Sequence, residues 1–359
     1  MLKFVFCKSK DNTPRLPLYS KEFPEIIHTS FSRMSSDSSD ICSICERPWN
    51  SFNYQVLSCN ACKLFFRRAI FGRAVKSCPN SGKCEPSTCR WCRLRKCIEA
   101  GMKFKMTQIQ SDQDDIFTLI ENLKVLNSQR NRLLLNFRFE GDPTVEELAR
   151  LSGPMRFQSR PENYQLDNIE WGNLAALTTI DYMKKFNFLN LLEFEDQVIL
   201  IRASFTDFDM ISNAMRSYGL RKAESTFPDG SDIFVKTDTV ICNNLENKIR
   251  CRLIGRIVDL NITPEEFLLL TSIFFCNPAI SNLSLSGKTI LTAYQKIYTS
   301  CLLQYCLITY QQNGSSRFSN LLSLYHSIKK AHEEIQIYFF FCKTKMPHLP
   351  FRRLFSHEP

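Results

Sequence analysis

Eight cysteines between residues 42 and 92 constrain this chain more than any other feature of its sequence. The first four follow the spacing C-x2-C-x13-C-x2-C, and the second four follow C-x5-C-x4-C-x2-C. A C-x2-C pair places two thiolates within one turn of chain, so both can reach one metal ion at about 2.3 Å. Four thiolates complete a tetrahedron with no open position, which is typical of a structural site. The predicted ligands are Cys42, Cys45, Cys59 and Cys62 for one ion, and Cys78, Cys84, Cys89 and Cys92 for the other.

Zinc is the metal that fits these ligands best. Residues 42–106 contain no histidine, and four thiolates without a redox role favour zinc over an iron–sulfur cluster. Disulfides are the other alternative, but the first residues show no secretory signal, and most of the remaining cysteines stand in apolar contexts typical of buried thiols. We therefore expect two zinc ions per chain in a reduced, intracellular protein. Each ion would contribute on the order of 10 kcal/mol to the folding of a module too small for a sufficient apolar core.

The positive charge of the chain is concentrated in the same segment. Residues 42–106 hold 13 Lys and Arg against 3 Asp and Glu, whereas the rest of the chain holds 33 of each. The whole net charge of +10 therefore falls within the cysteine-rich module. We expect double-stranded DNA as the partner, because a concentrated basic field attracts a polyanion whereas an ordinary solvated surface mixes both signs.

The stretch that follows Cys59 predicts a helix with one apolar and one cationic face. Steps of three and four place Asn60, Lys63 and Arg67 on one face, with Arg68 at its edge. The residues of the apolar face are Phe65, Phe66, Ala69 and Ile70. Such a helix, fixed by a metal, fits the major groove of DNA, where Lys63 can donate to guanine O6 and N7. The alternative is a solvated cationic face.

The segments "CNACKLFFRR" and "CRWCRLRKCIEAGM" resemble the DNA-binding domain of nuclear hormone receptors. "CNACK" is similar to the supplementary, hepatocyte nuclear factor 4-like receptors of nematodes. The resemblance implies two packed zinc motifs, a first helix in the major groove, and a second helix near Cys89 that braces the first. It also implies that Asn60, Ala61 and Leu64 set half-site preference, that Tyr54 contacts a phosphate, and that Arg93 and Lys96 contact the DNA backbone.

Two departures from that family pattern bear on the DNA site. Asn60 stands where the family has an acidic residue, and only four residues separate Cys84 from Cys89 where nine are usual. The shortened segment is the part that shapes DNA-dependent contacts between receptors. A homodimer or heterodimer is therefore expected from the family resemblance alone, and not from the residues of this segment.

Downstream of the module the pattern is helical. The expected organisation is a disordered arm at 1–41, the DNA-binding domain at 42–106, a polar hinge at 107–115 and an all-helical domain at 116–359. Thr144 with Glu147, and Thr263 with Glu266, have the spacing of a capping box, which predicts a helix start at each threonine.

The stretch 182–201 resembles the signature of the receptor ligand-binding domain, with Asp196 and Gln197 at the expected distance from Lys184. The resemblance implies a three-layer helical sandwich with an apolar cavity for a small lipophilic ligand. It also implies coregulator proteins as partners, with Lys184 capping the C-terminus of a coactivator helix, as the helix dipole favours. The chain ends in "LPFRRLFSHEP", in which Glu358 is followed only by Pro359, so no residue clearly supplies the acidic half of the charge clamp of the family's activation helix. This ending favours constitutive or repressive action.

The sequence therefore predicts a zinc-dependent, sequence-specific transcription factor of the nucleus. A zinc module that binds proteins, as in adaptors, is the rival, and the segregated charge argues against it. An enzyme is not expected, because we find neither a glycine-rich phosphate loop nor a convincing acid, base and nucleophile set. A membrane protein is not expected either, because the longest apolar stretch, near 267–276, is too short to span a bilayer.

Overall fold

The computed structural model describes residues 41–359, apart from 50, 73–74, 104–108, 152, 236–242, 346–350 and 356–359. The predicted disordered arm thus lies outside the described residues, except for Ile41. The predicted hinge lies partly outside them. Its described part belongs to a helix, because α3 begins at Ile109.

The cysteine-rich module consists of a short hairpin and two helices. Strands β1 (Ser51–Asn53) and β2 (Val56–Ser58) pair antiparallel, and the turn residues Tyr54 and Gln55 both have positive φ angles, of 50° and 72°. Two consecutive residues with positive φ give the kind of turn whose twist matches that of the two strands it joins. Helix α1 (Asn60–Phe71) follows the hairpin, and α2 (Arg90–Glu99) packs against α1.

The rest of the described chain is mainly helical. The long helices are α3 (Ile109–Asn136), α5 (Asn168–Met183), α6 (Phe194–Gly219), α7 (Asn243–Leu260), α8 (Pro264–Phe275), α9 (Leu285–Tyr310) and α11 (Leu324–Lys345). The shorter elements are β3 (Phe137–Arg138), α4 (Val145–Arg150), β4 (Gln158–Ser159), η1 (Leu189–Leu191), η2 (Gln311–Asn313), α10 (Gly314–Leu322) and η3 (Arg353–Phe355).

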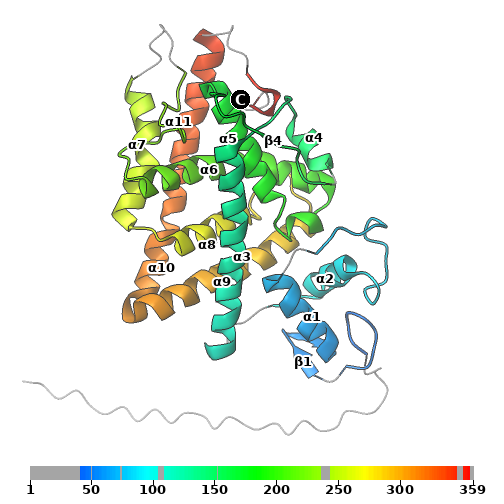
Figure 1. Cartoon of the computed structure of the whole chain (residues 1–359). Coiled ribbons are helices and arrows are strands. Elements are labelled where there is room, and N and C mark those ends of the chain that lie inside the picture. Colours follow the sequence, from blue (N-terminus) through cyan, green and yellow to red (C-terminus); the bar gives the residue numbers. More distant parts are fainter. Residues whose placement is uncertain are drawn as a thin grey trace, which may run out of the picture. The chain divides into compact units, whose positions relative to one another are not determined.

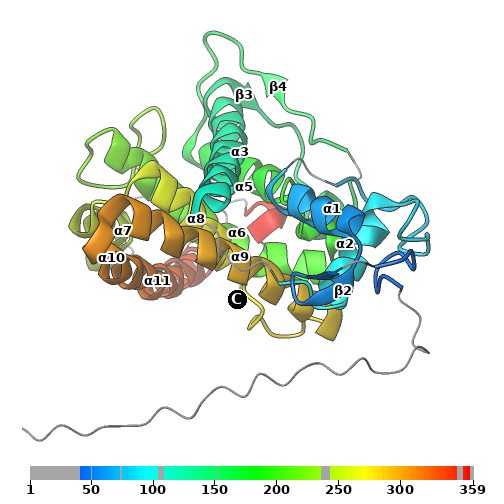
Figure 2. The same cartoon turned by 90° about the horizontal axis from the view of Figure 1, so that it is seen from below.

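These helices form three layers, as the family resemblance implied. Helices α6 and α8 pack against each other in the middle and contact α5 and α3 respectively on one side. On the other side α6 contacts α7 and α11, and α8 contacts α9. Figures 1 and 2 show α3 and α5 on one face of α6 and α11 on the opposite face. The layers bury a continuous apolar core in which Tyr182, Phe188 and Tyr294 are almost fully enclosed.

Both predicted capping boxes are confirmed. Thr144 accepts from the backbone amide of Glu147, and the Glu147 carboxylate accepts from the amide of Thr144 at 2.9 Å, which starts α4. Thr263 and Glu266 make the same reciprocal pair at the start of α8, with Pro264 in the first helical position. Within the described residues no helix combines the length and the apolar character needed to cross a membrane.

Candidate metal centres and nucleic-acid interface

The structure brings the eight predicted cysteines together in two groups of four. Cys42, Cys45, Cys59 and Cys62 form one group, and Cys78, Cys84, Cys89 and Cys92 form the other; within each group the sulfur atoms all lie within 4.8 Å of one another. The hairpin carries the chain from the first C-x2-C pair to the second, which opens α1 with Cys59 as its N-cap residue. Cys89 likewise precedes the first turn of α2.

The distances between sulfur atoms fit zinc. Cys45 Sγ lies 3.7 Å from Cys59 Sγ, and Cys78 Sγ lies 3.5 Å from Cys84 Sγ and 3.6 Å from Cys92 Sγ. A tetrahedron with metal–sulfur bonds of about 2.3 Å has edges of roughly 3.8 Å, whereas a disulfide needs about 2.05 Å. The two groups are therefore four-cysteine zinc sites, one ion each.

Backbone amides favour the thiolate form at two of these ligands, Cys42 and Cys78. Burial raises the pKa of Cys42, but hydrogen bonds from the amides of Cys59, Cys45 and Ile44 outweigh it and bring the pKa to about 7. The Asn80 amide donates to Cys78 Sγ at 3.4 Å. Because zinc binds the thiolate, groups that favour the charged sulfur strengthen the site.

Helix α1 turns its apolar face inward, as predicted. Phe66, Ala69 and Ile70 are buried, and Phe65 is half-buried. The outward face carries the five exposed residues predicted to contact DNA, namely Asn60, Ala61, Lys63, Leu64 and Arg68. The metal ligands at the start of α1 and the phenylalanines beneath it thus hold these five residues in place. We call them the exposed ridge of α1.

Three other predicted DNA contacts lie in different settings. The half-buried Tyr54 ring, at the hairpin turn, packs on Phe66 with 5.2 Å between ring centroids. Lys96 is exposed on α2. Arg67 forms an ion pair with Asp115 of α3, with 2.8 Å between Nε and Oδ2.

Arg93, which the family resemblance assigns to the DNA backbone, lies beside the first metal centre. Its Nη2 donates to Cys62 Sγ at 3.1 Å, and its guanidinium lies 4.8 Å from the centre of the Phe65 ring. Four thiolates around Zn²⁺ carry an excess of negative charge, which a neighbouring guanidinium offsets. The only sign of this contact in the sequence is that Arg93 directly follows the ligand Cys92.

Lys184, at the end of α5, points toward α4. Its Nζ donates to the carbonyl oxygens of Leu148 at 2.6 Å and Leu151 at 2.9 Å. Burial lowers the pKa of this ammonium, and the carboxylate of Asp181 acts in the opposite direction. Lys184 therefore caps the C-terminus of α4, a helix of this chain, while its contact with a coactivator helix stays a prediction.

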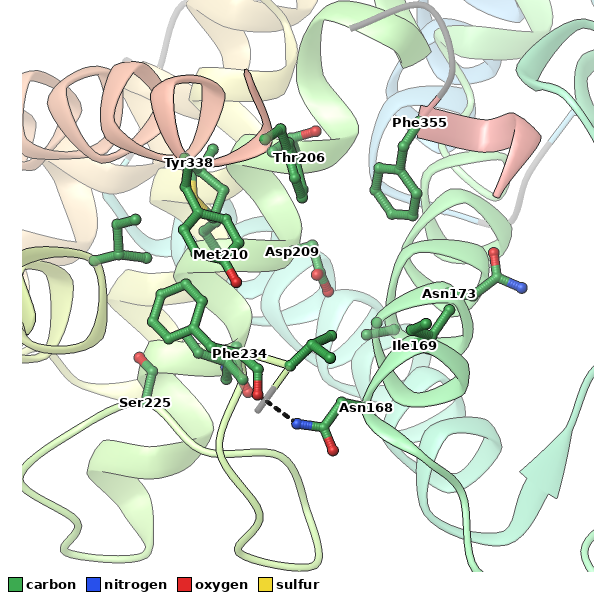
Figure 3. A pocket seen from close by; sticks show the side chains of 18 of the residues that line it. Asn168, Ile169, Asn173, Thr206, Asp209, Met210, Ser225, Phe234, Tyr338 and Phe355 are labelled. Atoms are coloured by element: carbon green, nitrogen blue, oxygen red, sulfur yellow. Dashed lines mark hydrogen bonds between the residues drawn. The ribbon is translucent and has the colours of Figure 1, made fainter. Parts of the chain in front are cut away.

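The helical domain contains a partly open cavity of about 220 Å³ between α5, α6, α7, α11 and η3. Aromatic rings supply much of its wall, and Figure 3 shows Phe234, Tyr338 and Phe355 around the space. Asp209 of α6 also lines it, and burial raises the pKa of this carboxyl to about 6, although the guanidinium groups of Arg130 and Arg216 lower it. The cavity is mainly apolar with a few polar groups, which is the usual make-up of a small-molecule site.

These features define a zinc-finger protein with a helical ligand-binding domain. Residues 40–104 match the family model of the C4-type double treble clef zinc finger, and residues 160–345 match that of the ligand-binding domain of nuclear hormone receptors. The chain therefore belongs to the nuclear hormone receptor family, whose members are transcription factors rather than enzymes.

Relatives in Caenorhabditis elegans are similar in sequence to this chain along most of its length. Nuclear hormone receptor family member nhr-167 is 38% identical over 326 residues, which cover 87% of this chain and 95% of the relative. Family member nhr-9 is 38% identical over 325 residues, which cover 89% and 96%. Family member nhr-27 is 35% identical over 321 residues, which cover 85% and 89%. The expected likeness to nematode receptors is thus confirmed, while the hepatocyte nuclear factor 4-like subtype stays a prediction.

Proposed function

We propose that this receptor acts in the nucleus by placing α1 in the major groove of a specific DNA site. The observation that carries the proposal is the exposed ridge of α1, on which Asn60, Lys63 and Arg68 point outward from a zinc-fixed scaffold. Lys63 and Asn60 would read base edges, and Arg68, Tyr54 and Lys96 would hold phosphates. Ala61 and Leu64, on the same ridge, would contribute apolar contacts to the bases.

Arg67 and Arg93 have secondary roles in this proposal. Arg67 faces Asp115 and would reach DNA only by leaving that ion pair. Arg93 would support the ridge by holding Cys62 and Phe65 rather than by direct contact with a phosphate. A protein-binding adaptor remains the alternative class, and it predicts no preference among DNA sequences.

The cavity supports a small lipophilic ligand as a further partner. A compact apolar molecule with one hydrogen-bonding group would suit the aromatic wall and the Asp209 carboxyl. Coregulator proteins would bind near Lys184, and a second receptor would complete a dimer. Constitutive or repressive action is the alternative to ligand-switched activation.

The Lys63→Ala variant should weaken binding to the preferred DNA site by about 1–3 kcal/mol and relax the base preference at one position. The physical reason is the loss of a donor to base edges. Binding of the full-length chain to the preferred and to scrambled duplexes measures the effect. Lys83→Ala is the matched control, because this exposed cation lies outside α1 and should weaken all sequences alike. An equal loss for Lys63→Ala on both duplexes would make Lys63 a phosphate contact only.

A further inference from the structure

Helix α4 lies on the surface where the proposed coregulator residue, Lys184, ends α5. The Lys184 ammonium binds the carbonyl oxygens of Leu148 and Leu151, at the C-terminal end of α4. Along its length α4 packs against α6. The two helices run in opposite directions, because Arg150 at the end of α4 lies over the ring of Phe194 at the start of α6, 4.3 Å from its centroid.

The side of α4 that faces the domain is apolar. Val145 and Leu148, three positions apart, are 3% and 0% exposed, and Ala149 is partly buried against the same core. Six residues are too few for a helix that is stable in water by itself, so α4 depends on this docking. It docks as an amphipathic helix does, with its apolar residues against the domain and its polar residues outward.

The other end of α4 is acidic and meets basic side chains. Glu146 forms an ion pair with Arg202 of α6. Glu147 pairs with Arg353 of η3, with 2.8 Å between Oε1 and Nη2, and the Arg353 backbone amide donates to Asp142 Oδ1 at 3.0 Å. Figure 1 shows α4 next to this C-terminal segment. An arginine thus stands at the N-terminal end of the docked helix, opposite the lysine at its C-terminal end.

We propose that α4 is a built-in occupant of the coregulator groove and that a partner helix must displace it to bind. The proposal rests on the proposed role of Lys184 in coregulator binding. While two carbonyl oxygens of α4 hold the ammonium, it cannot cap a partner helix. The partner that fits is an amphipathic helix like α4, with apolar residues three positions apart and acidic residues near its N-terminus to meet Arg202 and Arg353.

Binding of a labelled peptide tests the proposal on the full-length chain. The probe is a fluorescent synthetic peptide with the sequence of residues 141–154, and fluorescence anisotropy gives its Kd. The Val145→Ser/Leu148→Ser variant should release α4 and bind the peptide about tenfold more tightly than the unaltered chain, because an occupied groove lowers apparent affinity. Adding Lys184→Ala to that variant should weaken binding by about tenfold. Lys185→Ala is the matched control, since Lys185 pairs with Asp181 at 2.7 Å and should leave the Kd unchanged.

A second measurement needs no altered protein. Hydrogen exchange of residues 145–150 in the unaltered chain should accelerate when an isotopically labelled copy of the peptide saturates it. Unchanged exchange, or equal peptide affinity for the unaltered and released chains, would overturn the occupancy of the groove by α4. If Lys184→Ala leaves the Kd of the peptide for the released chain unchanged, the coregulator role of Lys184 is overturned instead. Neither result depends on DNA binding.

Discussion

Replacement of Cys59 by serine should remove one of the two zinc ions and abolish specific DNA binding. Cys59 is both a ligand of the first zinc site and the N-cap residue of α1, so its loss frees the helix that carries the exposed ridge. The ion supplies on the order of 10 kcal/mol of folding free energy, more than a small domain can lose. Affinity for the preferred site should fall to that for random DNA, a loss of at least about a thousandfold.

Metal analysis and DNA binding of the full-length variant measure this effect together. Cys97→Ser is the matched control, because Cys97 is also buried in the module but belongs to neither four-cysteine group. It should keep two zinc ions per chain and the affinity for the preferred site. A Cys59→Ser chain that retains both ions would show that Cys59 is not a ligand.

The Arg317→Ala variant should lower the free energy of unfolding by about 3–5 kcal/mol. Glu266 of α8 is 0% exposed, and Arg317 of α10 meets its carboxylate, with 2.7 Å between Nε and Oε1. The same guanidinium donates to the carbonyl oxygen of Asn261, beyond the end of α7, at 3.1 Å. Removal of the arginine leaves a buried carboxylate without its cation, which costs far more than the loss of an exposed pair.

Denaturant unfolding of the full-length chain measures this loss. Arg138→Ala is the control, because Arg138 pairs with the exposed Glu140 and should change stability by less than about 1 kcal/mol. The double variant Arg317→Ala/Glu266→Gln should recover part of the loss, since the buried group is then neutral. A loss below about 1 kcal/mol for Arg317→Ala would show that the carboxylate finds another partner.

Local sequence signals predicted the scaffold well. Cysteine spacing alone predicted both zinc sites, because two C-x2-C pairs in the first site and one in the second restrict the geometry before the chain folds. The capping boxes at Thr144 and Thr263 fixed two helix starts, since all four groups of each box lie within one turn. The inward face of α1 followed from helical spacing for the same reason.

Contacts between segments that are far apart in the sequence could not be predicted from local signals. The ion pair of Arg67 joins residues 48 positions apart, and that of Glu147 with Arg353 spans 206 positions. Lys184 illustrates the difference: its contact with α4 depends on how α4 packs against α6, which no local pattern around Lys184 reveals. The cavity likewise arises from five elements that no single periodic pattern describes.

Equilibrium binding of the full-length chain to a duplex selected from random DNA, with and without a zinc chelator, tests the central claim most directly. The account predicts tight binding to the selected site, its reduction to the level of random DNA when both ions are removed, and its recovery when zinc is restored. Undiminished binding to the selected duplex by a metal-free chain would contradict it.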